Sequence, residues 1–169
     1  MALQRVVIAC VLFLGALSAC QTTSTGPILV PNSPTAPSTP SAGDQAAILA
    51  LMAAEAEAVI HDDSSGLLEI WAADGLIRDA NHTPNDPTDD YTWAGHDAIL
   101  SRYLTIVFPL YISQLERAEV QLTIEAETAT ASATTLIEGE ISPGGEVWTF
   151  SRIDGAWRIA SIVFNLEAP

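Results

Sequence analysis

The pair of side chains with the clearest chemical potential in the sequence is Asp79 and His82, which lie three residues apart in the segment IRDANH. A carboxylate and an imidazole this close in sequence could bond one another and move a proton as general base and general acid. Asp, Asn and His are also common in polar turns, and Pro84 and Pro87 follow directly. The segment therefore has two interpretations, a catalytic pair or a solvated turn.

Metal and cofactor sites are not expected. Asn and Asp oxygens are frequent between positions 81 and 90, but the Asp-x-Asn-x-Asp-Gly order of a dedicated calcium loop is missing, so a solvated loop is favoured. The three histidines, His61, His82 and His96, have no cysteine after position 20 to act as a fellow ligand, which argues against a transition-metal site. There is no glycine-rich phosphate loop, and we expect no cofactor.

The charge balance is strongly acidic. Asp and Glu number 21 against six basic residues, which gives a net charge of −15, and all six basic residues are arginines. Nucleic-acid binding is improbable because phosphate contacts need clustered Lys or Arg. A Schiff-base mechanism is excluded because it needs a lysine amine. The net charge favours a neutral or cationic ligand over an anionic one.

The first 43 residues predict export and membrane attachment. Residues 1–20 carry Arg5, an apolar run and then Leu17-Ser18-Ala19-Cys20, which resembles the lipobox of bacterial lipoproteins. We expect lipid on Cys20 and attachment to the bacterial cell envelope; the alternative is ordinary signal cleavage that leaves the cysteine unmodified. Residues 21–43 are rich in Thr, Ser and Pro without any charge, which predicts an extended tether or a glycosylated stalk.

Residues 44–169 have the length of one domain, with helices first and strands last. Apolar residues at helical spacing predict helices over 46–60, with Asp44 as N-cap, over 66–72, capped by Ser64 or Ser65, and over 97–108, ended by Pro109. A short strand is expected at 76–79. From 113 onward a period of two predicts antiparallel strands, with a turn at 143–145 and a hairpin of 147–153 and 157–166 about Asp154-Gly155. This order indicates an α+β fold, three helices packed on a curved, mostly antiparallel sheet that encloses a cone-shaped barrel.

Three motifs in this order resemble the SnoaL-like branch of the nuclear transport factor 2-like superfamily. They are IWAAD at 70–74, WAGHDAI at 93–99 and DGAWRI at 154–159. Most of these residues serve structure, so the resemblance implies a fold and a cavity more than a reaction. It further implies that the domain could form homodimers through its sheet, as relatives often do.

The resemblance implies a cavity between the helices and the concave sheet face. Aromatic side chains are the expected pool for its lining, although each could equally be a core residue: Trp71, Tyr91, Trp93, Tyr103, Phe108, Trp148, Phe150 and Phe164.

Asp79 aligns with the proton-moving carboxylate of steroid isomerases in this superfamily. The oxyanion-hole positions of those enzymes fall near Glu55 and residues 148–149, which do not match, and a carboxylate would oppose a developing negative charge. Other superfamily enzymes combine acids, histidines or an arginine, so Asp79, His82, Arg78 and Glu55 form a second candidate set.

Two hypotheses follow. In the first, the domain binds a small, largely apolar molecule or acts as an accessory module. In the second, it is a lyase, isomerase or hydrolase that uses Asp79 as general base.

Overall fold

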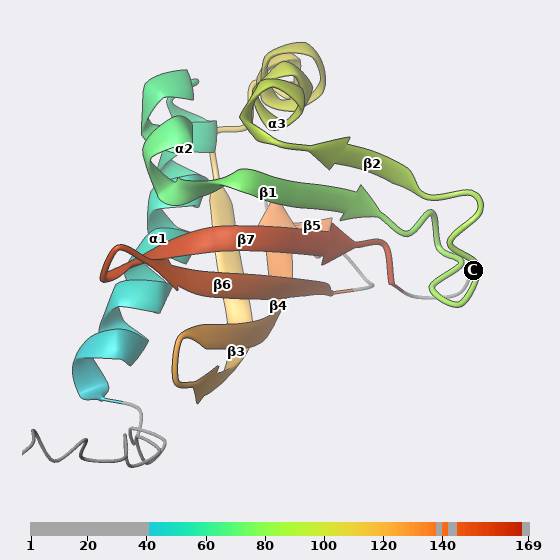
Figure 1. Ribbon diagram of the computed structural model, residues 1–169. Helices are drawn as coiled ribbons and strands as arrows, with labels where there is room; N and C mark the ends of the chain where they lie inside the picture. Colours follow the sequence, from blue (N-terminus) through green and yellow to red (C-terminus); the bar gives the residue numbers. More distant parts are fainter. Residues whose placement is uncertain (1–40, 138–139, 142–144, 167–169) are drawn as a thin grey trace, which may run out of the picture. The chain divides into compact units, whose positions relative to one another are not determined.

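The computed structural model describes residues 41–137, 140–141 and 145–166 (Figure 1). The predicted signal and lipobox at 1–20, most of the tether at 21–43 and most of the turn at 143–145 lie outside the described residues. Within the described ranges, no helix combines the length and the apolar character needed to cross a bilayer.

Two helices begin the domain. Helix α1 (Ala42–Ile60) is capped by Ser41, whose hydroxyl accepts from the backbone N–H of Asp44 while the Asp44 carboxylate accepts from Ser41. The prediction of Asp44 as N-cap was therefore wrong: Asp44 is the third helical residue of a capping box. Helix α2 (Ser64–Ile70) is capped by Asp63, which accepts from Gly66 N–H, and not by Ser64 or Ser65. It ends before Trp71, where the first strand begins.

The predicted third helix is divided into three kinds of turn. Regular helix α3 (His96–Arg102) continues as a π-helical segment, η1 (Tyr103–Val107), and then as a 3-10 turn, η2 (Phe108–Leu110). Pro109 was expected to end the helix at Phe108, but it lies within the 3-10 turn. Proline is tolerated there because the first turn of a helix does not need its backbone N–H. In the π segment each backbone hydrogen bond spans five residues, where an α-helix spans four, and such segments are frequent at functional sites.

The sheet contains seven strands in the order β2-β1-β7-β6-β4-β3, with β5 added beside β4. Their bounds are β1 (Trp71–Asp79), β2 (Tyr91–Ala94), β3 (Leu115–Glu125), β4 (Thr128–Ile137), β5 (Glu140–Ile141), β6 (Glu146–Ile153) and β7 (Ala156–Phe164). Only β1 and β7 run parallel; the other described pairs are antiparallel. The predicted α+β class, the mostly antiparallel sheet and the 154–155 hairpin are confirmed.

The sheet is curved but does not close into a barrel. Strands β2 and β3 are its two ends, and no described pairing joins them. A closed barrel would need hydrogen bonds between the first and last strand. The expected barrel is therefore corrected to an open, curved sheet with helices packed on it.

Large and small side chains alternate across the core. Trp148 and Phe150 of β6 are fully buried, and their rings stack with centroids 6.0 Å apart. Their partners on β4 are Ala131 and Ala129, both buried. These small residues leave room for the aromatic rings beside them, so large and small side chains together fill the core.

Candidate functional site

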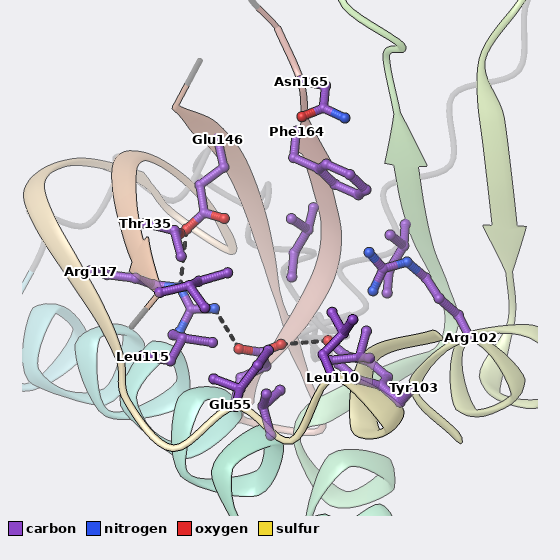
Figure 2. A pocket seen from close by; sticks show the side chains of 16 residues that line it. Glu55, Arg102, Tyr103, Leu110, Leu115, Arg117, Thr135, Glu146, Phe164 and Asn165 are labelled. Atoms are coloured by element: carbon purple, nitrogen blue, oxygen red, sulfur yellow. Dashed lines mark hydrogen bonds and ion pairs between the residues drawn. The ribbon is translucent and has the colours of Figure 1, made fainter. Parts of the chain in front are cut away.

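A partly open cavity of about 290 Å³ lies between α1, the α3–η1–η2 segment and the sheet (Figure 2). Nine of its sixteen lining residues are apolar: Val59, Ile77, Val107, Leu110, Ile112, Leu115, Ile137, Ile162 and Phe164. The polar ones are Glu55, Arg102, Tyr103, Arg117, Thr135, Glu146 and Asn165. A mostly apolar hollow with a few polar groups is the usual composition of a small-molecule site.

One wall of the cavity carries a buried network centred on Arg117 of β3. Its Nη2 donates to Oε2 of Glu55 at 2.5 Å, and its Nε donates to Oε1 of Glu146 at 3.0 Å. Nη1 donates to the carbonyl of Met52 in α1 at 3.0 Å. The guanidinium carbon lies 4.6 Å from the ring centroid of Trp148. Arg117 thus ties α1 to two strands and fixes both carboxylates.

Tyr103 completes the network from the first residue of η1. Its hydroxyl donates to Oε1 of Glu55 at 2.5 Å. Burial, followed by the charge of Glu55, raises the pKa of Tyr103 well above its ordinary value, so the phenol keeps its proton and acts as a donor. Burial alone would lower the pKa of Arg117, but Glu55 and Glu146 outweigh it and the pKa is raised. The network therefore consists of a permanent cation, two acids and a neutral phenol.

Arg102 lies across the cavity from Arg117 and Glu146 and on the same side as Tyr103, whose ring is 5.8 Å from its guanidinium carbon (Figure 2). It is the last residue of α3, and its guanidinium carbon lies 5.0 Å from the ring centroids of both Trp93 and Phe164. Its Nε is buried and has no hydrogen-bond partner among the described residues. Burial lowers the pKa of Arg102, yet an arginine remains charged in a protein. Thr135 Oγ1 is a second buried atom in the lining without a partner there.

Asp79 lies at the end of β1, half-buried and outside the cavity lining. Its Oδ1 accepts from the Asn165 amide at 2.7 Å and from the Asn81 N–H at 2.9 Å. Asn165 does line the cavity, so Asp79 contacts the site through one intervening side chain.

Of the other residues in the candidate catalytic set, Glu55 lines the cavity, whereas His82 and Arg78 do not. His82 is exposed, with a φ of 61°, and its N–H donates to the Asn165 carbonyl at 3.1 Å. Arg78 donates to Asp90 at 3.0 Å, whereas Glu55 belongs to the buried network. The structure does not gather Asp79, His82, Arg78 and Glu55 in one place.

Three of the eight predicted aromatic residues are at the cavity. Tyr103 and Phe164 line it. Trp93 is half-buried and reaches it indirectly, since its ring covers the Arg102 guanidinium.

The remaining five aromatic residues lie elsewhere. Trp148, Phe150 and Phe108 are core residues, and the Trp148 ring packs against the Arg117 guanidinium. Trp71 is also buried and borders a separate surface hollow. Tyr91 lies on edge strand β2 and is 61% exposed.

Sequence reasoning missed five polar residues of the cavity, of which three are charged, Arg102, Arg117 and Glu146, and two are neutral, Thr135 and Asn165. For two of them the strand period gave a signal, because Glu146 shares the inward parity of Trp148 and Phe150, and Arg117 shares that of Leu115. Charged residues at inward positions of a strand are rare enough to be informative. The described residues contain no group of three or more His, Cys, Asp or Glu arranged to hold a metal ion.

Comparison with known proteins defines the fold. No protein-family model matches the chain, and no curated protein matches it either. Solved structures do match. An NTF2-like protein of unknown function from Pseudomonas putida has a TM-score of 0.60 at 17% identity, covering 76% of this chain and 89% of that one. An NTF2-like protein with a cystatin-like fold from Novosphingobium aromaticivorans has a TM-score of 0.57 at 20% identity, covering 72% and 80%.

LinA, with a TM-score of 0.57 at 17% identity, matches over 72% of this chain and 84% of its own. These identities are low, so the matches concern the backbone and not the chemistry of the site. The helices and the curved sheet of this chain have the NTF2-like, cystatin-like fold.

Proposed function

We propose that this protein is an exported, membrane-anchored lipoprotein whose domain binds one small, largely apolar molecule in the cavity beside Tyr103. The observation that carries the proposal is the cavity of about 290 Å³, in which an apolar lining includes two buried polar atoms without a partner among the described residues, Arg102 Nε and Thr135 Oγ1. Buried polar atoms are nearly always hydrogen-bonded, so atoms of this kind facing a hollow favour a ligand or ordered water there.

Binding accounts for the geometry better than the alternative of a lyase, isomerase or hydrolase that uses Asp79 as base. Asp79 lies outside the lining, and its Oδ1 already accepts two hydrogen bonds. A general base must reach the proton that it removes, directly or through one water. Asp79 thus acts on the cavity by holding Asn165.

Export and anchoring are supported by Leu17-Ser18-Ala19-Cys20 after an apolar run, and by the uncharged, proline-containing stretch that follows. The same proposal includes membership of the SnoaL-like branch, supported by the three sequence motifs. Anchoring is tested by growing cells with a radiolabelled fatty acid. We expect label in the wild-type chain and none in Cys20→Ser; equal labelling of both chains would refute lipidation at this residue.

Ligand binding is tested by native mass spectrometry of the full chain, purified from its own cells in mild detergent. We expect a retained small molecule, which would identify the ligand. The variant Val107→Trp places a large ring in the lining, whereas Leu104→Trp adds the same ring to an exposed position of the same π segment. Val107→Trp should lose the molecule and Leu104→Trp should keep it. A wild-type chain without any retained molecule, or equal retention by both variants, would contradict the proposal.

A further inference from the structure

We propose that the ligand is an amphipathic anion, a compact apolar body that carries one carboxylate, and that Arg102 binds this carboxylate. The inference deepens the proposed function and rests on it, because it names the chemical class of the molecule in the same cavity.

Arg102 differs from the other arginines of the described domain in having no described acceptor. Each of the others donates to an acceptor: Arg78 to Asp90, Arg117 to Glu55, Glu146 and Met52, Arg152 to Asp44, and Arg158 to the Trp157 carbonyl. The rings of Trp93 and Phe164, at 5.0 Å, and of Tyr103, at 5.8 Å, surround the Arg102 guanidinium. The charges of Glu55 and Asp79 act on Arg102 from a distance, but neither carboxylate accepts a described hydrogen bond from it.

Rings on several sides hold the Arg102 guanidinium in a fixed orientation toward the cavity. Cation–π contacts compensate part of the loss of hydration, but they accept no hydrogen bond from the N–H groups. A cation that is partly removed from water is best stabilised by an anion with matching geometry. The planar fork of a guanidinium matches a carboxylate with two parallel bonds. The unfilled donors of Arg102 therefore favour a carboxylate.

The opposite wall determines how such a molecule would lie. Glu55 and Glu146 share one cation, Arg117, so this network has a formal charge of −1 and repels a second anion. Arg102 lies across the cavity from Arg117 and Glu146 (Figure 2). The carboxylate would bind at Arg102 beneath Phe164, and the apolar body would contact side chains such as Ile162 and Val107.

This class of ligand differs from the neutral or cationic one that the net charge of −15 favours. The net charge is a sum over the whole chain, and charges at the surface are screened over about 8–10 Å at physiological ionic strength. A side chain that faces the cavity is screened much less. The local charge of Arg102 should therefore decide the ligand's sign.

The test compares two pairs of ligands that differ only in charge: cyclohexanecarboxylate against cyclohexanecarboxamide, and benzoate against benzamide. Binding to the full chain in mild detergent is measured by isothermal titration calorimetry. We expect the wild type to bind each acid at least about tenfold more tightly than its amide. In Arg102→Gln this preference should vanish. Arg102→Lys, which keeps the charge without the fork, should retain only part of it.

Arg158→Gln is the matched control, because it removes one positive charge outside this cavity. It should preserve the preference for acids. Should Arg102→Gln fail to fold, the wild-type comparison and Arg102→Lys still decide the question. Equal binding of acid and amide by the wild type, or an unchanged preference in Arg102→Gln, would overturn the inference while leaving the binding function intact.

The retained molecule of the native-mass experiment separates the two proposals further. A retained carboxylic acid would support both. A retained neutral or cationic molecule would overturn the anion inference alone. The absence of any retained molecule would contradict the binding function and with it the inference.

Discussion

The hydroxyl of Tyr103 donates to Oε1 of Glu55 at 2.5 Å, joining the π-helical segment η1 to α1 across 48 residues of sequence. Both residues are buried, with 2% and 4% of their surfaces exposed. The bond is therefore largely shielded from bulk water, and it links the cavity lining to the stability of the domain.

Tyr103→Phe should destabilise the domain by about 1–3 kcal/mol, because one oxygen of a buried carboxylate loses its donor. The measurement is urea-induced unfolding followed by tryptophan fluorescence. Tyr111→Phe is the control: Tyr111 is 84% exposed, and its hydroxyl should contribute less than about 0.5 kcal/mol. Equal unfolding midpoints for the two variants would show that the Tyr103 bond does not stabilise the fold.

Arg117→Met should be the more damaging change, costing about 3–5 kcal/mol, because Glu55 and Glu146 would remain buried without their shared cation. Arg78→Met is the comparison, because the partly exposed Arg78 pairs with one carboxylate, Asp90, where Arg117 pairs with two, so we expect a smaller loss of stability. Adding Glu55→Gln and Glu146→Gln to Arg117→Met should restore part of the loss. If Arg117→Met unfolds at the same urea concentration as Arg78→Met, the network is not a major source of stability.

Asp44 should make the stability of the domain depend on acidic pH. The pKa of Asp44 is lowered from 3.8 to about 2, chiefly by the hydrogen bond from the Trp157 indole and then by that from Ser41; Arg152 also contributes. Because the folded value is the lower one, ionised Asp44 stabilises the protein above 3.8, and this contribution is lost as the pH falls through about 2.

The pH effect is measured by comparing urea unfolding of the wild type and Asp44→Asn from neutral pH down to a pH of about 2. The variant should be the less stable at neutral pH, and the difference should narrow as the pH falls. Ser41→Ala removes the second cause of the lowered pKa and should reduce the pH-dependent part of the stability. A difference between wild type and Asp44→Asn that stays constant with pH would contradict this account.

Asp79 should act by positioning Asn165. In Asp79→Ala the Asn165 amide and the Asn81 N–H both lose their acceptor, so we expect a loss of about 1–3 kcal/mol in the free energy of unfolding. The affinity for the retained ligand should also fall, since Asn165 lines the cavity. Asp79→Asn keeps an acceptor oxygen and should retain most of both. A ligand that is converted by the wild type but not by Asp79→Asn would instead restore Asp79 as a general base.

The sequence was a good guide wherever the information is local. The period of two predicted the strands, and Asp154-Gly155 predicted the final hairpin, because side-chain alternation and turn chemistry act between near neighbours. Boundaries were less certain. Ser41, three residues before Asp44, competes with it for the N-cap, and only the folded chain shows which one caps α1.

The sequence by itself determined the α+β class, the order of helices and strands, and the acidic character that argues against nucleic-acid binding. Only the tertiary structure decided which polar residues meet at the cavity. Arg117 lies 62 residues from Glu55 and 29 from Glu146, and no local pattern encodes a pairing over such distances. It arises because only β4 separates β3 from β6 in the sheet and because α1 packs against β3. Tyr103 of the π-helical segment reaches the same network through its bond to Glu55. Asp79, which the alignment selected, is the last residue of β1 and does not line the cavity. The side chain of Asn165 lies between Asp79 and the cavity.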